Sequence, residues 1–244
     1  MRHPLLLKYL SYRWVAYGLL LVSMVARLHT PAPRKNSSLP PDPAKVLASG
    51  QGQQLPCLEQ TIDLLPLIHH FADSILSLRL PYSHQQATDC SGTFLRLNAF
   101  LSRHCPTAVL PVLGQVRSTR DLVRYYHDRG QLVLIGQPLD SDSLIQPGTV
   151  MFYTQSNRGG KLAITADNMT SLVSHVGIVY AVERDSITGR VLNYELFHSR
   201  NPRYGIDITG HHRRQPYGSQ AAYPYGNGRQ QWMAAAPLAI PEGV

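Results

Sequence analysis

Three side chains of this protein could together cleave an acyl bond: one cysteine and two histidines. The cysteine lies in the run Asp89–Gly92 (Asp-Cys-Ser-Gly), which opens a stretch with apolar residues at helical spacing. Unpaired N–H groups and the positive end of the macrodipole at a helix start favour the thiolate form of a cysteine. Cys90 is therefore a candidate nucleophile. The alternative is a cysteine that merely fills an apolar position at the end of a helix.

The two histidines, His175 and His198, lie in separate runs of β-branched and aromatic residues. Turn residues at 185–189 separate these runs, as expected of a β-hairpin. A hairpin centred between Ser186 and Ile187 places His175 directly opposite His198. Residues opposed in this way share one face of the sheet, with Cβ atoms about 5 Å apart. We therefore expect the two imidazoles to be neighbours, unless a bulge changes the register.

Cysteine-dependent amide cleavage needs a thiol, an imidazole that takes and returns its proton, and a group that orients this imidazole. Cys90, His175 and His198 could supply these three groups in this order. Backbone N–H groups at the start of the cysteine helix are suited to stabilise an oxyanion. We expect no metal ion and no other cofactor. The alternatives for the orienting residue are Asn193, Glu195 and Asn201.

A third block, Gln146–Tyr153 (Gln-Pro-Gly-Thr-Val-Met-Phe-Tyr), lies between the cysteine and the histidines. This ordered set resembles the NlpC-type cell-wall cysteine peptidases, a papain-like family. The family pattern is Asp-Cys-Ser-Gly on a helix, Pro-Gly-Asp before a strand and His-Val-Gly-Ile on the next strand. A third polar residue, often histidine, follows on the neighbouring strand. The resemblance covers residues 80 to 200.

The resemblance implies an α+β, papain-like NlpC-type fold, in which N-terminal helices pack on a small antiparallel sheet. It also implies a peptidoglycan hydrolase of the bacterial cell envelope that cleaves an amide bond of the stem peptide through a thioester. We favour an endopeptidase over a muramoyl-alanine amidase, and peptidoglycan stem peptides are the expected partners. Two other functions stay open: a non-catalytic wall-binding or secretion-machine accessory module on the same fold, and a papain-like acyltransferase.

By the same resemblance, Asp89, Ser91 and Tyr82 hold the substrate peptide. Asp89 could equally be a plain helix N-cap. The chain departs from the family pattern at three places: residues 83–88 replace a Gly-Gly loop, Thr149 replaces the aspartate after Pro-Gly, and an insertion is expected around 103–145.

Local patterns predict helices first and an antiparallel sheet afterwards, which is an α+β layout. The expected helices lie within 61–80, beginning near Pro66, from Cys90 to near His104, and over 119–129. The expected strands cover 131–135, 150–154, 176–182 and 191–198.

The N-terminus carries basic residues ahead of the apolar run 14–26, which is typical of membrane targeting. We expect a signal anchor or transmembrane segment at 1–29 and a Pro-rich linker at 30–55. The peptidase-like domain follows at 56–235, with a C-terminal tail at 236–244. We favour retention of the anchor over its cleavage as a signal peptide. Positive charge ahead of the span predicts an exported domain, periplasmic and anchored to the inner membrane.

The net charge of +8 is spread along the chain and not gathered in one block. We therefore expect no nucleic-acid partner, and we interpret the tyrosine-rich segment 211–225 as a loop. A diffuse positive field favours an anionic partner such as a cell wall or membrane surface. If the domain is exported and Cys90 is the nucleophile, Cys57 and Cys105 are left to form a disulfide. A domain facing the cytoplasm would keep all three cysteines reduced.

Overall fold

This computed structural model describes residues 64–136, 138–155, 162–212 and 230–239. The anchor and linker expected at 1–29 and 30–55, and Cys57, lie outside the described residues. None of the helices in the described ranges is long and apolar enough to cross a membrane.

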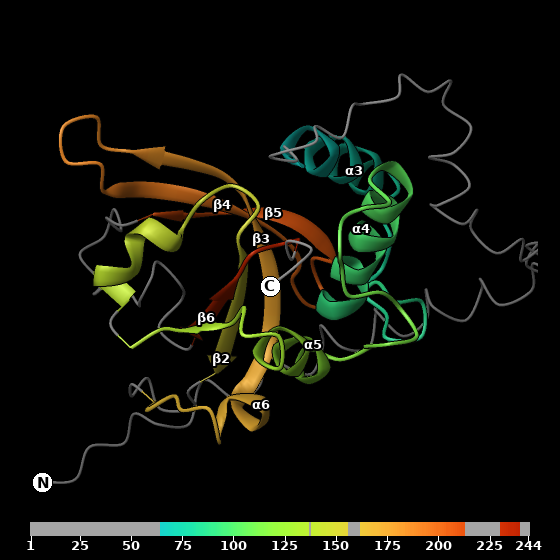
Figure 1. Ribbon diagram of the computed structural model, residues 1–244. Coiled ribbons are helices and arrows are strands. Elements are labelled where there is room, and N and C mark those ends of the chain that lie inside the picture. Colours follow the sequence, from blue (N-terminus) through green and yellow to red (C-terminus); the bar gives the residue numbers. More distant parts are fainter. Residues whose placement is uncertain (1–63, 137, 156–161, 213–229, 240–244) are drawn as a thin grey trace, which may run out of the picture. The chain divides into compact units, whose positions relative to one another are not determined.

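Among the described elements, three helices precede the strands of one antiparallel sheet, and two short helices lie between strands, which confirms the α+β class (Figure 1). The helices are α3 (Leu65–Ser77), α4 (Cys90–His104), α5 (Thr119–His127), the short α6 (Met169–Leu172) and the 3₁₀ helix η2 (Pro138–Leu144). The strands are β1 (Val133–Leu134), β2 (Val150–Gln155), β3 (Val173–Arg184), β4 (Val191–Ser199), β5 (Ile206–His212) and β6 (Gln230–Ala236). They form one antiparallel sheet in the order β1-β6-β2-β3-β4-β5.

Capping residues fix where the helices begin. Asp89 caps α4, because its carboxylate accepts a hydrogen bond from the Gly92 backbone N–H. Ser118 and Asp121 form a reciprocal capping box at the start of α5. The first helix, α3, has Pro66 in its first turn, as the sequence predicts.

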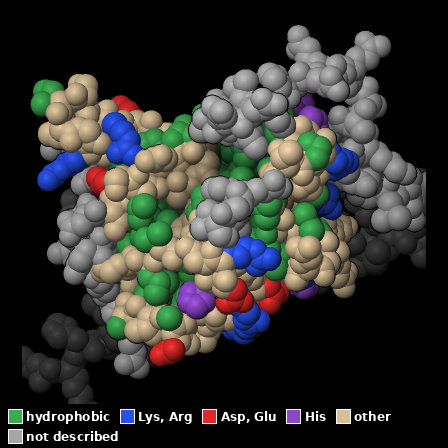
Figure 2. All heavy atoms as spheres, viewed as in Figure 1, with side chains coloured by type: hydrophobic (Ala, Val, Ile, Leu, Met, Phe, Trp, Pro, Cys, Tyr) green, Lys and Arg blue, Asp and Glu red, His purple; other side chains and the backbone are tan. Residues whose placement is uncertain are grey.

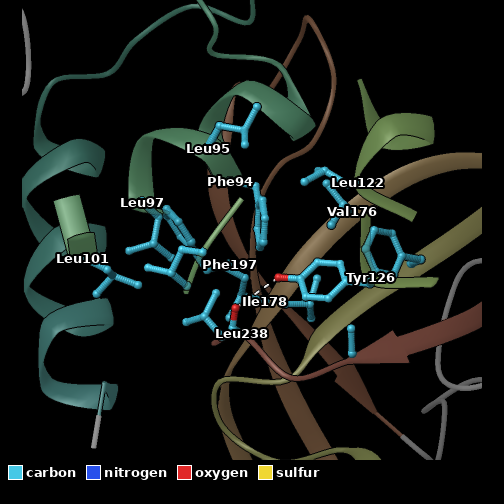
Figure 3. Packing of buried hydrophobic residues seen from close by; sticks show 14 of the residues in the cluster. Phe94, Leu95, Leu97, Leu101, Leu122, Tyr126, Val176, Ile178, Phe197 and Leu238 are labelled. Carbon is cyan, nitrogen blue, oxygen red and sulfur yellow. Dashed lines mark hydrogen bonds between the residues drawn. The ribbon is translucent and has the colours of Figure 1, made fainter. Parts of the chain in front are cut away.

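Helices α3, α4 and α5 cover one face of the sheet (Figure 1). Figure 3 shows this core from close by: apolar side chains of α4 and α5 meet those of β3 and β4. Among them are Phe94, Leu122, Val176, Ile178 and Phe197, each at most 2 % exposed. The other face of the sheet carries a second buried cluster, which includes Met151, Tyr153, Val179, Tyr194, Leu196 and Trp232.

The register of the β3–β4 hairpin differs from the predicted one. Ile178 pairs with Phe197, which shifts the alignment by two residues and leaves His175 without a directly opposite His198. The cause is the turn: the Asp185 carboxylate accepts hydrogen bonds from backbone N–H groups within it, and Gly189 takes a left-handed φ of 67°. The Asp185 N–H donates to the Arg190 carbonyl, so the loop has four residues. The predicted centre between residues 186 and 187 is therefore wrong.

Two strands were not expected. One is β5, which includes residues 211 and 212, the first two of the segment predicted to be a loop. The other is β6, which lies between β1 and β2 in the sheet. Packing also continues past the boundary placed after residue 235. Leu238 is buried, and its carbonyl accepts a hydrogen bond from the Tyr126 hydroxyl at 3.1 Å.

Charged side chains of the two signs are mixed on the face of the molecule seen in Figure 2. Lysine and arginine side chains are scattered over this face beside acidic and apolar ones, and they do not merge into one basic surface. This distribution agrees with the sequence, in which basic residues are dispersed along the chain.

Candidate active site

Cys90 is the first residue of α4, as the sequence predicts. The loop before it folds over the first helical turn, and Gly92 permits this close approach. A Cβ atom on Gly92 would lie 2.4 Å from the carbonyl carbon of Ala87, which is a severe overlap with backbone. The glycine of the Asp-Cys-Ser-Gly run therefore lets the loop and the helix start pack together.

The Cys90 thiol is nearly enclosed, since the residue is only 8 % exposed. Its sulfur lies 3.6 Å from the hydroxyl oxygen of Thr119, at the start of α5. Burial raises the pKa of the Cys90 thiol, and the Asp89 carboxylate raises it further. The Thr119 hydroxyl and the backbone of Val176 and Ser91 oppose this rise without cancelling it. The protonated thiol is therefore the resting form at neutral pH.

His175 and His198 form a direct pair. Nε2 of His175 lies 2.6 Å from Nδ1 of His198, with the ring planes inclined at 76°. Burial lowers the pKa of His175 to about 4, and the nearby His211 adds to this effect. Burial and the neighbouring His175 lower the pKa of His198 well below its ordinary value. Both rings are therefore neutral at neutral pH, and the prediction that they are neighbours is confirmed.

The thiol lines the same cavity as His198, but no hydrogen bond joins the sulfur to either histidine. Val176 and Ile178 point towards the helices, so His175, which alternates with them, faces the other side of the sheet. The ladder of β3 and β4 runs no further than Ile178 and Phe197 in this direction. A narrow cavity adjoins this end of the ladder, with no room for a water molecule. It is lined by Cys90, Thr93, Phe94, Val176, Gly177, Ile178, Phe197 and His198.

Asp89 and Ser91 are both engaged by Arg117, a residue that the sequence analysis does not single out. One Asp89 oxygen accepts hydrogen bonds from the Gly92 N–H at 2.8 Å and from Arg117 at 3.1 Å. Arg117 also donates to the Ser91 hydroxyl at 3.0 Å. Burial alone would raise the pKa of Asp89, but the bonds from Arg117, His84 and Gly92 hold it below its usual value. Asp89 is thus an ionised N-cap, which is one of its two predicted roles.

Tyr82 lies close enough to the start of α4 for the charged groups there to change the pKa of its hydroxyl. Burial raises the pKa of its hydroxyl, the neighbouring Cys90 and Asp89 raise it further, and Arg117 opposes them. The three residues expected to hold a substrate peptide therefore gather around the N-terminus of α4. A further bond ties the end of β4 to this region, because the Ser199 hydroxyl donates to the Thr88 carbonyl at 2.6 Å.

The remaining predictions for this site concern cysteine pairing and metals. Cys90 is a free thiol and Cys105 takes part in a disulfide. Cys57, its expected partner, lies outside the described residues. Within the ranges that the structure describes, no group of three or more His, Cys, Asp or Glu residues could hold a metal ion. Comparison with protein-family models, with curated proteins and with solved structures finds no match for this chain.

Proposed function

We propose that this chain is a cysteine hydrolase that cleaves an amide bond in the stem peptides of peptidoglycan, with endopeptidase action favoured over muramoyl-alanine amidase action. We also propose that its α+β domain has the papain-like NlpC-type fold. One observation carries the proposal. The thiol at the first position of α4 lies beside the strands that hold a buried pair of neutral histidines. The order Cys90, His175, His198 along the chain matches the order in that family.

In the first half of the reaction, His175 acts as the base. Its Nε2 is engaged by His198, so Nδ1 is the ring atom left to accept the thiol proton. As this proton leaves, the sulfur attacks the amide carbonyl carbon, and backbone N–H groups at the start of α4 stabilise the oxyanion. The C–N bond then breaks. The leaving amine takes the proton from His175, and a thioester remains on Cys90.

In the second half, a water molecule gives a proton to His175 and attacks the thioester carbon. The C–S bond breaks, and the sulfur takes the proton back from His175. The products are a free thiol, a carboxylic acid and the amine released earlier. Each half-reaction uses the same nitrogen in both directions, so it requires one ring orientation and one tautomer of His175.

For this mechanism the thiol must turn away from Thr119. In the structure its sulfur shares a hydrogen bond with the Thr119 hydroxyl, and its cavity is too narrow for water. Rotation about the Cα–Cβ bond of Cys90 would release the sulfur from Thr119. Because His175 faces the other side of the sheet, the end of the β3–β4 strand pair would also have to open for its Nδ1 to reach the sulfur. Because thiol and imidazole are both neutral at rest, the proton moves during attack and not before it.

The polar groups around α4 would bind the peptide backbone of the substrate. Tyr82 offers a hydroxyl group, and Arg117 keeps part of its side chain at the surface, with 28 % exposed. Ser91 is buried and its hydroxyl is held by Arg117, so it would act through this arginine. The Asp89 carboxylate is already hydrogen-bonded by Arg117 and His84. Its role would therefore be to hold the arginine and the helix start. The dispersed positive charge suits the carboxylates of wall peptides.

The decisive experiment uses the full chain and purified sacculi, with released muropeptides identified by mass spectrometry. We expect Cys90→Ala and His175→Ala each to abolish release. His127→Ala is the matched control, because His127 is exposed on α5 and far along the helix from its N-terminus. Undiminished release by Cys90→Ala would overturn the mechanism. The masses of the fragments identify the bond that is cut.

The buried, protonated thiol favours a second function, in which the chain is a non-catalytic module that binds wall peptides on the same surface. A raised thiol pKa and a hydrogen bond to Thr119 are features of a buried structural cysteine. This function predicts that the wild-type chain releases no fragments and still sediments with sacculi. It also predicts that Cys90→Ala sediments as well as the wild type.

A further inference from the structure

The histidine pair continues into a longer chain of hydrogen bonds on β5. Nε2 of His198 lies 2.9 Å from the hydroxyl oxygen of Thr209. The same oxygen lies 3.0 Å from Nε2 of His211. Four side chains from three adjacent strands are therefore connected in one line: His175, His198, Thr209 and His211.

The positions of these residues follow from the β4–β5 register. Leu196 pairs with Thr209 and Tyr194 with His211, so both β5 side chains point to the same face as His198. The His211 ring stacks on Tyr194 with centroids 4.8 Å apart and an interplanar angle of 4°. Tyr194 is itself fixed, because it is fully buried and its hydroxyl lies 3.0 Å from that of Tyr153. Its stacking on Tyr194 thus holds His211 in place in the line.

Each link in this line holds one hydrogen, so the two bonds of the neutral His198 ring run in the same direction, and Thr209 passes this direction on to His211 when its hydroxyl donates to that ring. A neutral imidazole donates through one nitrogen and accepts through the other, and a hydroxyl donates once. If His175 donates from Nε2, His198 must donate to Thr209, and the Thr209 hydroxyl then has His211 as the acceptor for its own hydrogen. In the opposite direction, His211 donates to Thr209, Thr209 donates to His198, and His198 donates to Nε2 of His175. A neutral His175 then carries its hydrogen on Nδ1.

Only one of these directions suits a base. The mechanism proposed above requires Nδ1 of His175 to be free of hydrogen, so that it can take the thiol proton. We propose that Thr209 and His211 are positioning residues that hold His175 in the tautomer with its hydrogen on Nε2. This inference rests on the proposed function for its catalytic consequence, but the tautomer itself can be measured without any activity.

The hydroxyl of Thr209 is the link to remove. In Thr209→Val the side chain keeps its shape, but His198 loses its acceptor at Nε2. A buried N–H without an acceptor is unfavourable, so His198 should move its hydrogen to Nδ1 and donate to His175. Nδ1 of His175 would then carry the hydrogen. Thr209→Ser keeps the hydroxyl and should restore the original tautomer.

The experiment combines two readouts on the full chain. Long-range ¹H–¹⁵N correlation spectra of histidine-labelled protein report which nitrogen of His175 carries hydrogen. Hydrolysis of a soluble stem peptide gives kcat and KM separately. We expect Thr209→Val to invert the His175 tautomer and to lower kcat by roughly 10²-fold, the size of a lost general-base contribution, with KM unchanged. Thr209→Ser should recover both.

His211 is tested in the same way, with its neighbour as control. His211→Phe keeps a ring that can stack on Tyr194 and removes the acceptor for Thr209, so it should shift the tautomer towards Nδ1–H and lower kcat. His212→Phe alters the next residue, which is exposed on the opposite face of β5, and should change neither quantity. An unchanged His175 tautomer in both Thr209→Val and His211→Phe would overturn the inference.

The two proposals fail in different ways. If Cys90→Ala keeps full activity, the cysteine mechanism is wrong, while the spectra still decide whether Thr209 and His211 set the tautomer. If Cys90→Ala is inactive and Thr209→Val keeps both its tautomer and its kcat, the mechanism stands and the positioning role is wrong.

Discussion

His175 and His198 touch through their ring nitrogens at 2.6 Å although they are not opposite each other in the sheet. The observed register aligns Ile178 with Phe197. Continued by one residue, this register puts His198 level with Gly177 and diagonal to His175. Gly177 has no side chain to separate the two rings: a Cβ placed there would lie 2.7 Å from the Leu196 side chain and 3.1 Å from the Cβ of His198. The diagonal contact therefore depends on the glycine of the Ser-His-Val-Gly run as well as on the two histidines.

Replacing His198 by alanine should disable the base without preventing substrate binding. The change leaves the buried Nε2 of His175 without its partner and frees the ring to rotate. We expect kcat on a soluble stem peptide to fall roughly 10²-fold, with KM nearly constant. Steady-state kinetics measure both quantities.

His127→Ala serves as the control for His198→Ala, since it removes an exposed imidazole. A His198→Ala variant with wild-type kcat would show that another residue orients His175. Asn193 and Glu195, the alternatives on the same strand, would then be substituted in turn.

The folded state should lose stability as the pH falls below 6.5. An unfolded histidine has a pKa near 6.5, whereas burial lowers the pKa of His175 to about 4 in the folded protein. The unfolded chain thus binds the proton first, so stability is fully present above pH 6.5 and is lost progressively towards pH 4. This one group contributes on the order of 3 kcal/mol, and His198 acts in the same direction. Urea unfolding at pH 7.0, 5.5 and 4.5 measures the slope.

A His175→Phe variant separates this effect from general acid denaturation. Removing the buried titratable ring should flatten the pH dependence of the unfolding free energy between pH 6.5 and 4. An equally steep slope in the variant would mean that other groups cause the loss.

The sequence carried enough information for the helix starts and for the face of each histidine, because these depend on neighbours within a few residues. Asp89 and Gly92 are the local signals for the cysteine helix. The prediction that His175 and His198 share one face of the sheet holds although the predicted register was wrong. A shift of two residues keeps each side chain on the same face. The register itself depends on the four-residue turn, in which the Asp185 carboxylate and Gly189 act together.

Other parts of the site depend on packing between distant segments. Arg117 and Thr119 reach the start of α4 only because α5 packs beside it, and nothing local in their sequence marks this contact. The strand β6 was missed for a different reason. Its residues are buried in an almost continuous run, Gln231 to Ala236, so the alternation that identifies a half-exposed strand is absent.

Substituting alanine for Gly92 should destabilise the domain and displace the thiol. The new Cβ would overlap the backbone of Ala87, which cannot move as easily as a side-chain tip. Forcing an extra methyl group into a close contact costs roughly 1–3 kcal/mol. Gly136→Ala is the matched control, because nothing lies within 4 Å of the Cβ that it would add. Thermal unfolding of the two variants compares them directly, and equal midpoints would contradict the packing argument.

Removing Arg117 should destabilise the start of α4, because the Asp89 carboxylate loses its hydrogen bonds from the guanidinium group. Arg117→Ala leaves Asp89 with His84 and the Gly92 N–H as partners, so we expect the pKa of Asp89 to rise and the domain to lose roughly 1–3 kcal/mol. Arg124→Ala, at an exposed position of α5, is the control. A double-mutant cycle with Asp89→Asn measures the coupling, and additive effects would show that the ion pair is not the cause.

The hydroxyl of Thr119 should control the ionisation of the thiol. Its hydrogen bond to the sulfur opposes the effect of burial, so Thr119→Val should raise the pKa of Cys90 further. At a fixed pH the rate of alkylation by iodoacetamide should fall, and its pH profile should move to higher pH. Thr93→Val is a closely matched control in the same cavity. The Thr93 hydroxyl is buried and has no hydrogen-bond partner, so its loss should leave the alkylation profile in place and should not lower stability. If the two variants shift the profile equally, the loss of a nearby hydroxyl is responsible and the Thr119 bond is not.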